Sequence, residues 1–73
     1  MTFCYGKLRG KIVEVFGSQS EFAKAMGFSN RTLSLKMNNK IDWRQEEIYC
    51  AMELLGIPDE QVCEYFFTQK VKR

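Results

Sequence analysis

The chain has 73 residues, of which 45% are hydrophobic and 27% are charged, a composition typical of one globular domain near the lower size limit for a single core. No apolar run approaches the roughly 18 residues of a membrane span, and the first residues lack the charged-then-apolar order of a secretory signal. Residues 1–45 carry a net charge of +5 and residues 46–73 a net charge of −3, an asymmetry that would draw the basic half towards a polyphosphate. We therefore expect a single cytoplasmic domain over residues 1–73, without membrane association.

Apolar residues at helical spacing predict a first helix over about residues 5–16. Ser18 and Glu21 then match a capping box, in which a hydroxyl and a carboxylate satisfy free amides at a helix start. This signal predicts a second helix over about residues 19–26. Gly27 is expected to end it in a left-handed conformation that disfavours a side chain.

Ser29 is placed to cap a third helix over residues 30–39. Leu33 and Met37 lie four residues apart, which puts both on one side of that helix. We expect this pair to face the core.

Asp42 is expected to cap a fourth helix that Gly56 ends, and Pro58 is expected to be the first residue of a fifth helix. The C-terminal residues 68–73 are expected to fray. The apolar stripe of the fourth helix consists of Ile48, Ala51, Met52 and Leu55, and that of the fifth of Val62, Cys63, Phe66 and Phe67.

The second and third helices are separated by a three-residue turn, which is the spacing of a helix-turn-helix over about Gln19–Asn39. Ala23 supports this interpretation, because a larger side chain at a close crossing would push two helices apart. The alternative is a purely structural corner between two helices.

If Leu33 and Met37 face inward, the other side of the third helix carries both polar and apolar residues. In a recognition helix this side contacts the base edges. Arg31 could bind guanine through two parallel hydrogen bonds, Asn30 could pair with adenine, and Leu35 could contact a thymine methyl group. A solvated face is the alternative, and for Leu35 also a contact with a second copy. The predicted base-reading residues are Asn30, Arg31, Ser34, Leu35 and Asn38.

Phosphate contacts are expected from the edges of this face. The start of the second helix offers amides and the positive end of a helix dipole, and three cations flank the third helix. Each cation could instead be a solubilising surface charge. The predicted phosphate-binding residues are Gln19, Ser20, Lys36, Lys40 and Arg44.

The chain contains three cysteines and no histidine. Because Cys4, Cys50 and Cys63 are widely spaced, they form neither a CxxC motif nor a zinc-binding set, and we expect buried or half-buried free thiols. The commonest general base is missing, and so is a glycine-rich phosphate loop. We therefore expect no enzymatic activity, no metal, no cofactor and no small-molecule ligand.

Residues 18–33, continuing to 37–40, resemble the helix-turn-helix of lambdoid-type phage repressors and Cro proteins. Residues 41–48, 54–58 and 64–67 resemble the short Cro/repressor-like proteins of phages and prophages of Gram-positive bacteria. The resemblance covers nearly the whole chain. It implies an all-α, five-helix lambda-repressor-like DNA-binding domain that binds a near-palindromic operator in double-stranded DNA as a homodimer.

The resemblance also implies base-reading roles for Asn30, Arg31, Ser34 and Leu35. This agrees with their expected position on the side of the third helix that faces away from the core. One position departs from the family. Lys36 stands where many members have an inward apolar residue, and Met37 is expected to fill that role one position later.

Together these observations predict a sequence-specific transcriptional regulator of the repressor type, associated with the nucleoid. Phe66 and Phe67 are expected at the dimer interface, because a small core can hardly absorb both; packing within the core is the alternative. A second class of protein also fits the sequence: an antitoxin or antirepressor module that uses the helix-turn-helix scaffold to bind a protein partner.

Overall fold

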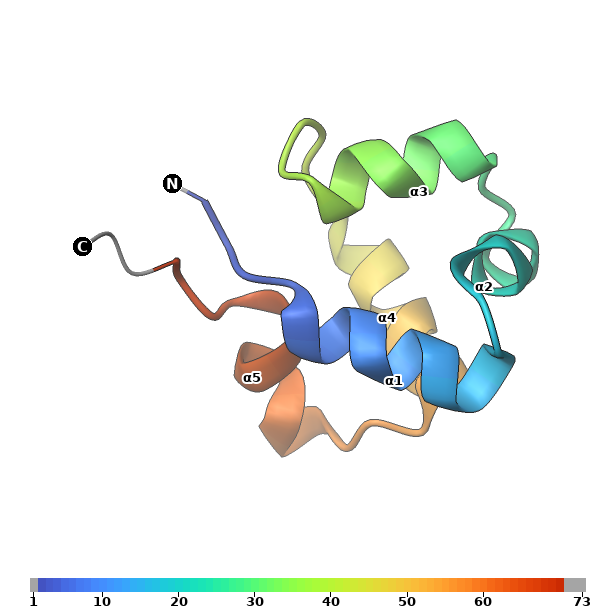
Figure 1. Cartoon of the computed structure of the whole chain (residues 1–73). Coiled ribbons are helices and arrows are strands. Elements are labelled where there is room, and N and C mark those ends of the chain that lie inside the picture. Colours follow the sequence, from blue (N-terminus) through green and yellow to red (C-terminus); the bar gives the residue numbers. More distant parts are fainter. Residues whose placement is uncertain (1, 71–73) are drawn as a thin grey trace.

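The computed structural model describes residues 2–70. In this part of the chain the regular elements are helical, as predicted, and the pairing of extended backbone is limited to an isolated bridge between Phe3 and Gln69. Figure 1 shows α1 crossing the middle of the domain, with α3 above it and α5 below. The elements are α1 (Gly6–Phe16), α2 (Gln19–Met26), α3 (Asn30–Met37), α4 (Gln45–Leu55), a 3-10 helix η1 (Asp59–Gln61) and α5 (Val62–Phe66).

The core lies where α1, α2 and α4 meet, closed at its two ends by α3 and α5. Helical spacing accounts for all of its members except Tyr5 and Ile57, because each helix turns one apolar side inward. None of the helices within residues 2–70 has the length and apolar character needed to cross a membrane. The buried hydrophobic residues are Tyr5, Leu8, Ile12, Phe22, Ala23, Leu33, Met37, Ala51, Met52, Leu55, Ile57, Tyr65 and Phe66.

Local signals set the starts of α2 and α3. The Ser18 hydroxyl accepts a hydrogen bond from the Glu21 amide at 3.2 Å, and the Ser29 hydroxyl accepts one from the Thr32 amide at 3.1 Å. The other half of the expected capping box differs: the Glu21 carboxylate pairs with Lys24 at 3.3 Å instead. Both serine caps are therefore confirmed.

Helix α3 ends at Met37, two residues earlier than predicted. Asn39 has a φ of 62°, a left-handed conformation that asparagine tolerates and a continuing helix does not. Its side chain is held by the N-terminal segment, because its amide oxygen accepts from the Phe3 amide at 2.9 Å and its NH₂ group donates to the Phe3 carbonyl at 2.8 Å. A contact far away in sequence therefore fixes the turn after α3.

The predicted starts of the last two helices were wrong. Arg44 is the N-cap of α4 rather than Asp42, and its amide donates to Oε1 of Glu47 at 2.9 Å. Pro58 has an extended backbone, with a φ of −69° and a ψ of 152°, and precedes η1 instead of opening α5. Because the 3-10 turn comes first, α5 is only five residues long and turns Tyr65 inward rather than Cys63.

The three cysteine side chains also lie elsewhere than expected. Cys4, Cys50 and Cys63 are all exposed and free. On α5 the inward side carries Tyr65 instead of Cys63. On α4 Cys50 is exposed, next to the buried Ala51. The expectation of buried or half-buried thiols was therefore wrong.

The two chain ends lie side by side. The Cys4 amide donates to the Thr68 carbonyl at 2.6 Å, and the Lys70 amide donates to the Thr2 carbonyl at 3.2 Å. These bonds flank the bridge between Phe3 and Gln69, and we call the paired segments 2–4 and 68–70 the terminal clip. Residues 68–70 were predicted to fray and are paired instead; residues 71–73 lie outside the described part of the chain.

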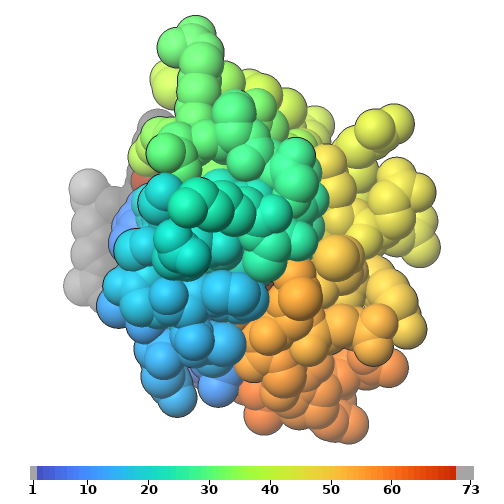
Figure 2. All heavy atoms as spheres, turned by 90° about the vertical axis from the view of Figure 1, so that its right-hand side faces the viewer, coloured from blue at the N-terminus to red at the C-terminus, as the bar shows by residue number. Residues whose placement is uncertain are grey.

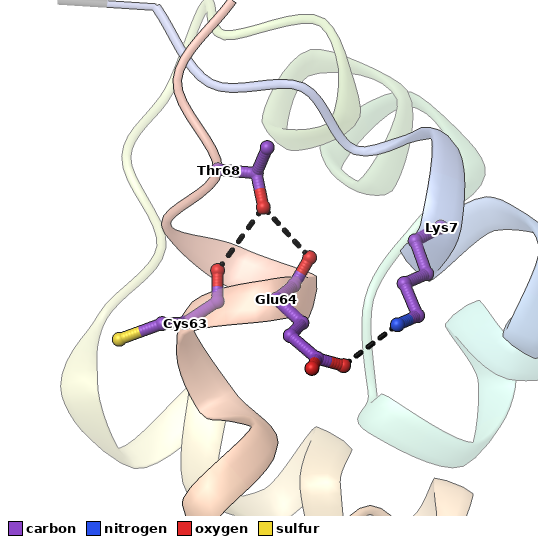
Figure 3. A network of polar contacts seen from close by, with 4 residues as sticks. All are labelled: Lys7, Cys63, Glu64 and Thr68. Carbon is purple, nitrogen blue, oxygen red and sulfur yellow. Dashed lines mark hydrogen bonds and ion pairs between the residues drawn. The ribbon is translucent and has the colours of Figure 1, made fainter.

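Side chains at the end of α5 support the clip (Figure 3). The Thr68 hydroxyl donates to the carbonyls of Cys63 and Glu64 at 3.2 and 2.9 Å. The Glu64 carboxylate bonds Nζ of Lys7 at 2.6 Å. The hydrogen bond to Glu64 raises the pKa of Lys7 above its ordinary value. This network joins α5 to the start of α1.

Gly10 and Gly27 form a matched pair for a stability measurement. Gly10 lies within α1, where an added Cβ would meet no atom within 4 Å, whereas Gly27 ends α2 with a φ of 79°. We expect Gly10→Ala to raise the free energy of unfolding by about 0.5–1 kcal/mol, because alanine loses less entropy in a helix. Gly27→Ala should lower it by about 1–2 kcal/mol, since a side chain is strained in the left-handed region. Urea denaturation measures both, and a destabilised Gly10→Ala would contradict the open space around α1.

Candidate functional site

Helices α2 and α3 are joined by a short turn over residues 27–29, as the predicted helix-turn-helix requires. The turn closes through hydrogen bonds from the Phe28 amide to the Ala23 carbonyl at 2.8 Å and from the Gly27 amide to the Lys24 carbonyl at 3.1 Å. Ala23 is 1% exposed, as expected for a small side chain in a close crossing. The Ser29 cap then starts α3 in its new direction. Each of the two helices buries one side and leaves the other at the surface.

The inner side of α3 consists of three residues. Leu33 and Met37 are buried, as their spacing predicted, and Lys36 is buried between them in register. The lysine at position 36 therefore does not change which side of α3 faces inward. The lysine takes the inward position, and Met37 lies inward beside it.

The outer side of α3 carries the residues that were predicted to read bases. Asn30, Arg31, Ser34 and Asn38 are exposed, and the helix forms the upper surface of the domain in Figure 2. The Asn38 NH₂ group donates to the backbone carbonyl of Ser34 at 2.8 Å and to the Ser34 hydroxyl at 3.4 Å. Their orientation follows the prediction, and their contact with DNA remains a prediction. We call Asn30, Arg31, Ser34, Leu35 and Asn38 the α3 outer face.

Leu35 departs from the expectation of a leucine pointing away from the protein. It is half-buried, because the segment after α3 folds back over this part of the helix. The Leu35 carbonyl accepts hydrogen bonds from the amides of Lys40 and Ile41 at 2.8 and 3.3 Å. Leu35 therefore contributes an apolar border to the α3 outer face rather than a projecting tip.

Lys36 was expected on the surface as a phosphate ligand, and the structure places it in the interior. The residue is 4% exposed, and its Nζ lies 2.8 Å from Oε1 of Glu47 and 3.0 Å from the Asp42 carbonyl oxygen. Burial of an ammonium group is costly unless it is paired and hydrogen-bonded. These contacts meet that requirement and neutralise the ammonium group. The prediction that Lys36 binds a phosphate at the surface was therefore wrong.

An aromatic cluster surrounds the Lys36 ammonium. Its Nζ lies 5.3 Å from the ring centre of Phe28 and 5.9 Å from that of Trp43, within the range of a cation–π attraction. Trp43 packs edge-on against Phe66, with ring centres 5.1 Å apart, and also contacts Tyr5. The buried indole N–H of Trp43 has no hydrogen-bond partner within residues 2–70. The cluster joins α3 to α5 across the middle of the domain.

Glu47 is the partner that the sequence analysis missed. Burial alone would raise the pKa of its carboxyl group, but the hydrogen bonds from Lys36 and from the Arg44 amide outweigh burial, so the pKa lies below its ordinary value. A lysine in an inward helical position requires a buried carboxylate, and the capping position of Glu47 in α4 brings one there.

The remaining predicted phosphate ligands are arranged unevenly. Gln19 and Ser20 are half-buried, and the Gln19 side-chain oxygen accepts a hydrogen bond from Nε of Arg9 at 3.4 Å. Lys40 is exposed, and Arg44 is exposed beside Glu46, with 3.8 Å between Nε and Oε1. The surface around α3 is therefore less positive than the sequence suggested.

The two phenylalanines expected at a dimer interface have opposite environments. Phe66 is 1% exposed in the core against Trp43, so its predicted interface role was wrong. Phe67 is 46% exposed and packs edge-on against Phe3, with ring centres 5.8 Å apart. A role for Phe67 in a dimer remains a prediction.

A hollow of about 450 Å³ lies beside the segment after α3, between that segment and the terminal clip. Its walls are mainly aromatic and aliphatic, with Trp43 at the base and Ile41 and Phe67 at the rim. Within residues 2–70, no three Asp, Glu or Cys side chains are grouped so that they could hold a metal ion.

The described residues form a small all-helical domain of five α-helices, in which α3 leaves one side exposed. Residues 1–69 match the family described as "Protein of unknown function (DUF739)", and the chain belongs to this family. A comparison with curated proteins found no match.

The chain is also similar to a solved structure, the modulator of repression (MOR) of the temperate bacteriophage TP901-1 from Lactococcus lactis, determined in solution. The two sequences are 44% identical, the match covers 99% of this chain and 97% of that one, and the TM-score is 0.82. This similarity supports the phage context that the sequence predicted. Membership of the Cro or repressor proteins remains a prediction.

The buried ion pair gives a prediction for stability. Glu47→Gln should lower the free energy of unfolding at neutral pH by about 3 kcal/mol, because it leaves the Lys36 ammonium buried without its counter-charge. A carboxyl group whose pKa is lower in the folded than in the unfolded protein stabilises the fold above its unfolded pKa, and this stabilisation is lost as the pH falls through the folded pKa. The difference between wild type and Glu47→Gln should therefore shrink in acid. Urea denaturation across a pH series measures it.

The matched control is Glu46→Gln. The Glu46 side chain is 82% exposed and only loosely paired with Arg44, so its removal should change stability by less than about 0.5 kcal/mol at any pH. Equal effects of the two substitutions would contradict a special role for the buried pair.

Proposed function

We propose that this chain is a phage or prophage regulator that modulates transcriptional repression by binding a repressor protein through its α3 outer face. The observation that carries this proposal is the 44% identity, over nearly the full length of both chains, to a phage protein described as a modulator of repression. In this role the protein acts in the host cytoplasm, without catalysis and without a cofactor.

The chemistry of the α3 outer face favours a protein partner. A surface that binds polyphosphate gains most of its affinity from cations, yet Lys36 is neutralised in the interior and Arg44 lies beside a carboxylate. What remains is a mixed surface, with the guanidinium of Arg31, small polar groups and the half-buried Leu35. Arginine among polar groups and an apolar border is typical of protein interfaces.

Operator binding by a Cro-like homodimer is the second candidate. One observation favours it: Asn30, Arg31 and Ser34 are exposed at the N-terminal end of α3, where recognition helices contact bases. Two copies would place their α3 helices in successive major grooves, roughly 34 Å apart. Gln19, Ser20, Lys40 and Arg44 would then bind phosphates.

Arg31→Ala tests both candidates. If the partner is a repressor protein, calorimetric titration with the purified repressor of the same phage should show binding about tenfold weaker or more, as for an arginine at the centre of an interface. If the partner is DNA, the wild-type chain should select a two-fold symmetric site from a randomised pool, with affinity that falls steeply as salt increases.

Lys70→Ala is the matched control, because it removes one positive charge from the exposed C-terminal segment and leaves α3 unchanged. It should bind like the wild type in both assays. Wild-type behaviour of Arg31→Ala with repressor and with DNA would overturn the assignment of the α3 outer face.

A further inference from the structure

A groove runs along the outer side of α4, where this helix faces η1 and the start of α5. Two hollows of about 330 and 270 Å³ adjoin there and share the side chains of Tyr49, Met52 and Asp59. Half of their other lining residues are aliphatic, and the rest are two polar side chains and a glycine. We call this feature the α4 groove. Its lining includes Ile48, Tyr49, Met52, Ile57, Asp59 and Val62.

Tyr49 is the prominent side chain of the α4 groove. It lines both hollows and is 61% exposed, and its ring and hydroxyl make no aromatic contact or hydrogen bond within residues 2–70. Stability of the domain does not require a large aromatic group in this position. A tyrosine is, however, an effective interface anchor, since it offers a large rigid surface and a hydroxyl at low entropic cost.

The charge around the α4 groove has one sign. Residues 45–69 contain six carboxylates and neither lysine nor arginine. Glu47 and Glu64 are neutralised by Lys36 and Lys7. Glu53 and Asp59, which line the groove, have no ion pair among residues 2–70. The groove therefore combines an apolar floor with an uncompensated negative border.

We propose that the α4 groove binds a cationic amphipathic segment of a protein partner. An apolar side chain of that segment would pack on Tyr49 and Met52, while its lysines or arginines would meet Glu53 and Asp59. The negative border repels nucleic acids and anionic membranes, and an uncharged apolar partner would leave both carboxylates desolvated without a counter-charge.

The α4 groove is separate from the α3 outer face. In Figure 2 the yellow to orange residues of α4 and the segment after it run down the right-hand side of the molecule, with the orange part at the lower right, and green α3 lies at the top. The inference thus goes beyond the proposed function and does not depend on it. A chain with both surfaces could hold two partners at once.

The test uses a synthetic amphipathic helical peptide of leucine and lysine, titrated into the full chain labelled with ¹⁵N. We expect saturable binding with amide shifts concentrated in residues 45–62. Tyr49→Ala should weaken binding about tenfold without a change in net charge. The double variant Glu53→Gln with Asp59→Asn should weaken it by a similar factor and reduce its salt dependence.

Leu54→Ala is the matched control, since Leu54 is also exposed on α4, at 36%, and does not line the groove. Its affinity should equal that of the wild type. Polylysine, which has the charge without the apolar side, should bind clearly more weakly. The proposal is overturned if no binding occurs, if Tyr49→Ala binds like the wild type, if polylysine binds equally well, or if the shifts lie in α3. These assays contain neither repressor nor DNA, so their failure leaves the proposed function standing.

Discussion

The ion pair between Lys36 and Glu47 is the contact on which the position of α3 depends. Helix α3 has only eight residues, and an isolated helix shorter than about 12–15 residues is marginal in water. Packing on the domain must therefore hold it. Leu33 and Met37 supply apolar contact, while the buried ammonium of Lys36 accepts few alternative positions, because it must meet its carboxylate in a region that excludes water.

This pair also connects the surface to the core. Glu47 accepts hydrogen bonds both from Lys36 and from the amide that starts α4, so one carboxylate fixes the end of α3 and the beginning of α4. Trp43, between these helices, packs against the core residue Phe66. The outer face of α3 is thus carried by a rigid base, although its own residues are polar and exposed.

Much of the fold could be predicted, because the signals for α2 and α3 are local. Ser18, Gly27 and Ser29 each act on backbone groups within a few residues, and both helices begin where those residues indicated. The later elements depend on distant contacts. The φ of Asn39 is set by Phe3, and the 3-10 turn before α5 changes which side of that helix faces inward.

The candidate site, too, could be predicted only where local periodicity decides it. The inward pair Leu33 and Met37 indicated which side of α3 is exposed, because helical periodicity alone decides it. The burial of Lys36 could not be predicted from periodicity, since it requires a carboxylate from another helix. The adjacent Phe66 and Phe67 have the same chemistry, yet Phe66 packs against Trp43 in the core while Phe67 lies at the surface in contact with Phe3.

The terminal clip joins the two most distant parts of the described chain, and its hydrogen bonds lie at the surface. Closing so long a loop costs more entropy than forming a contact between neighbouring helices, so we expect the clip to open more readily than the helical core in local fluctuations. Since Asn39 is fastened to Phe3 within it, each opening also releases the turn that follows α3. Amide hydrogens of this turn should therefore exchange with solvent together with those of the chain ends, far away in sequence, as one cooperative unit.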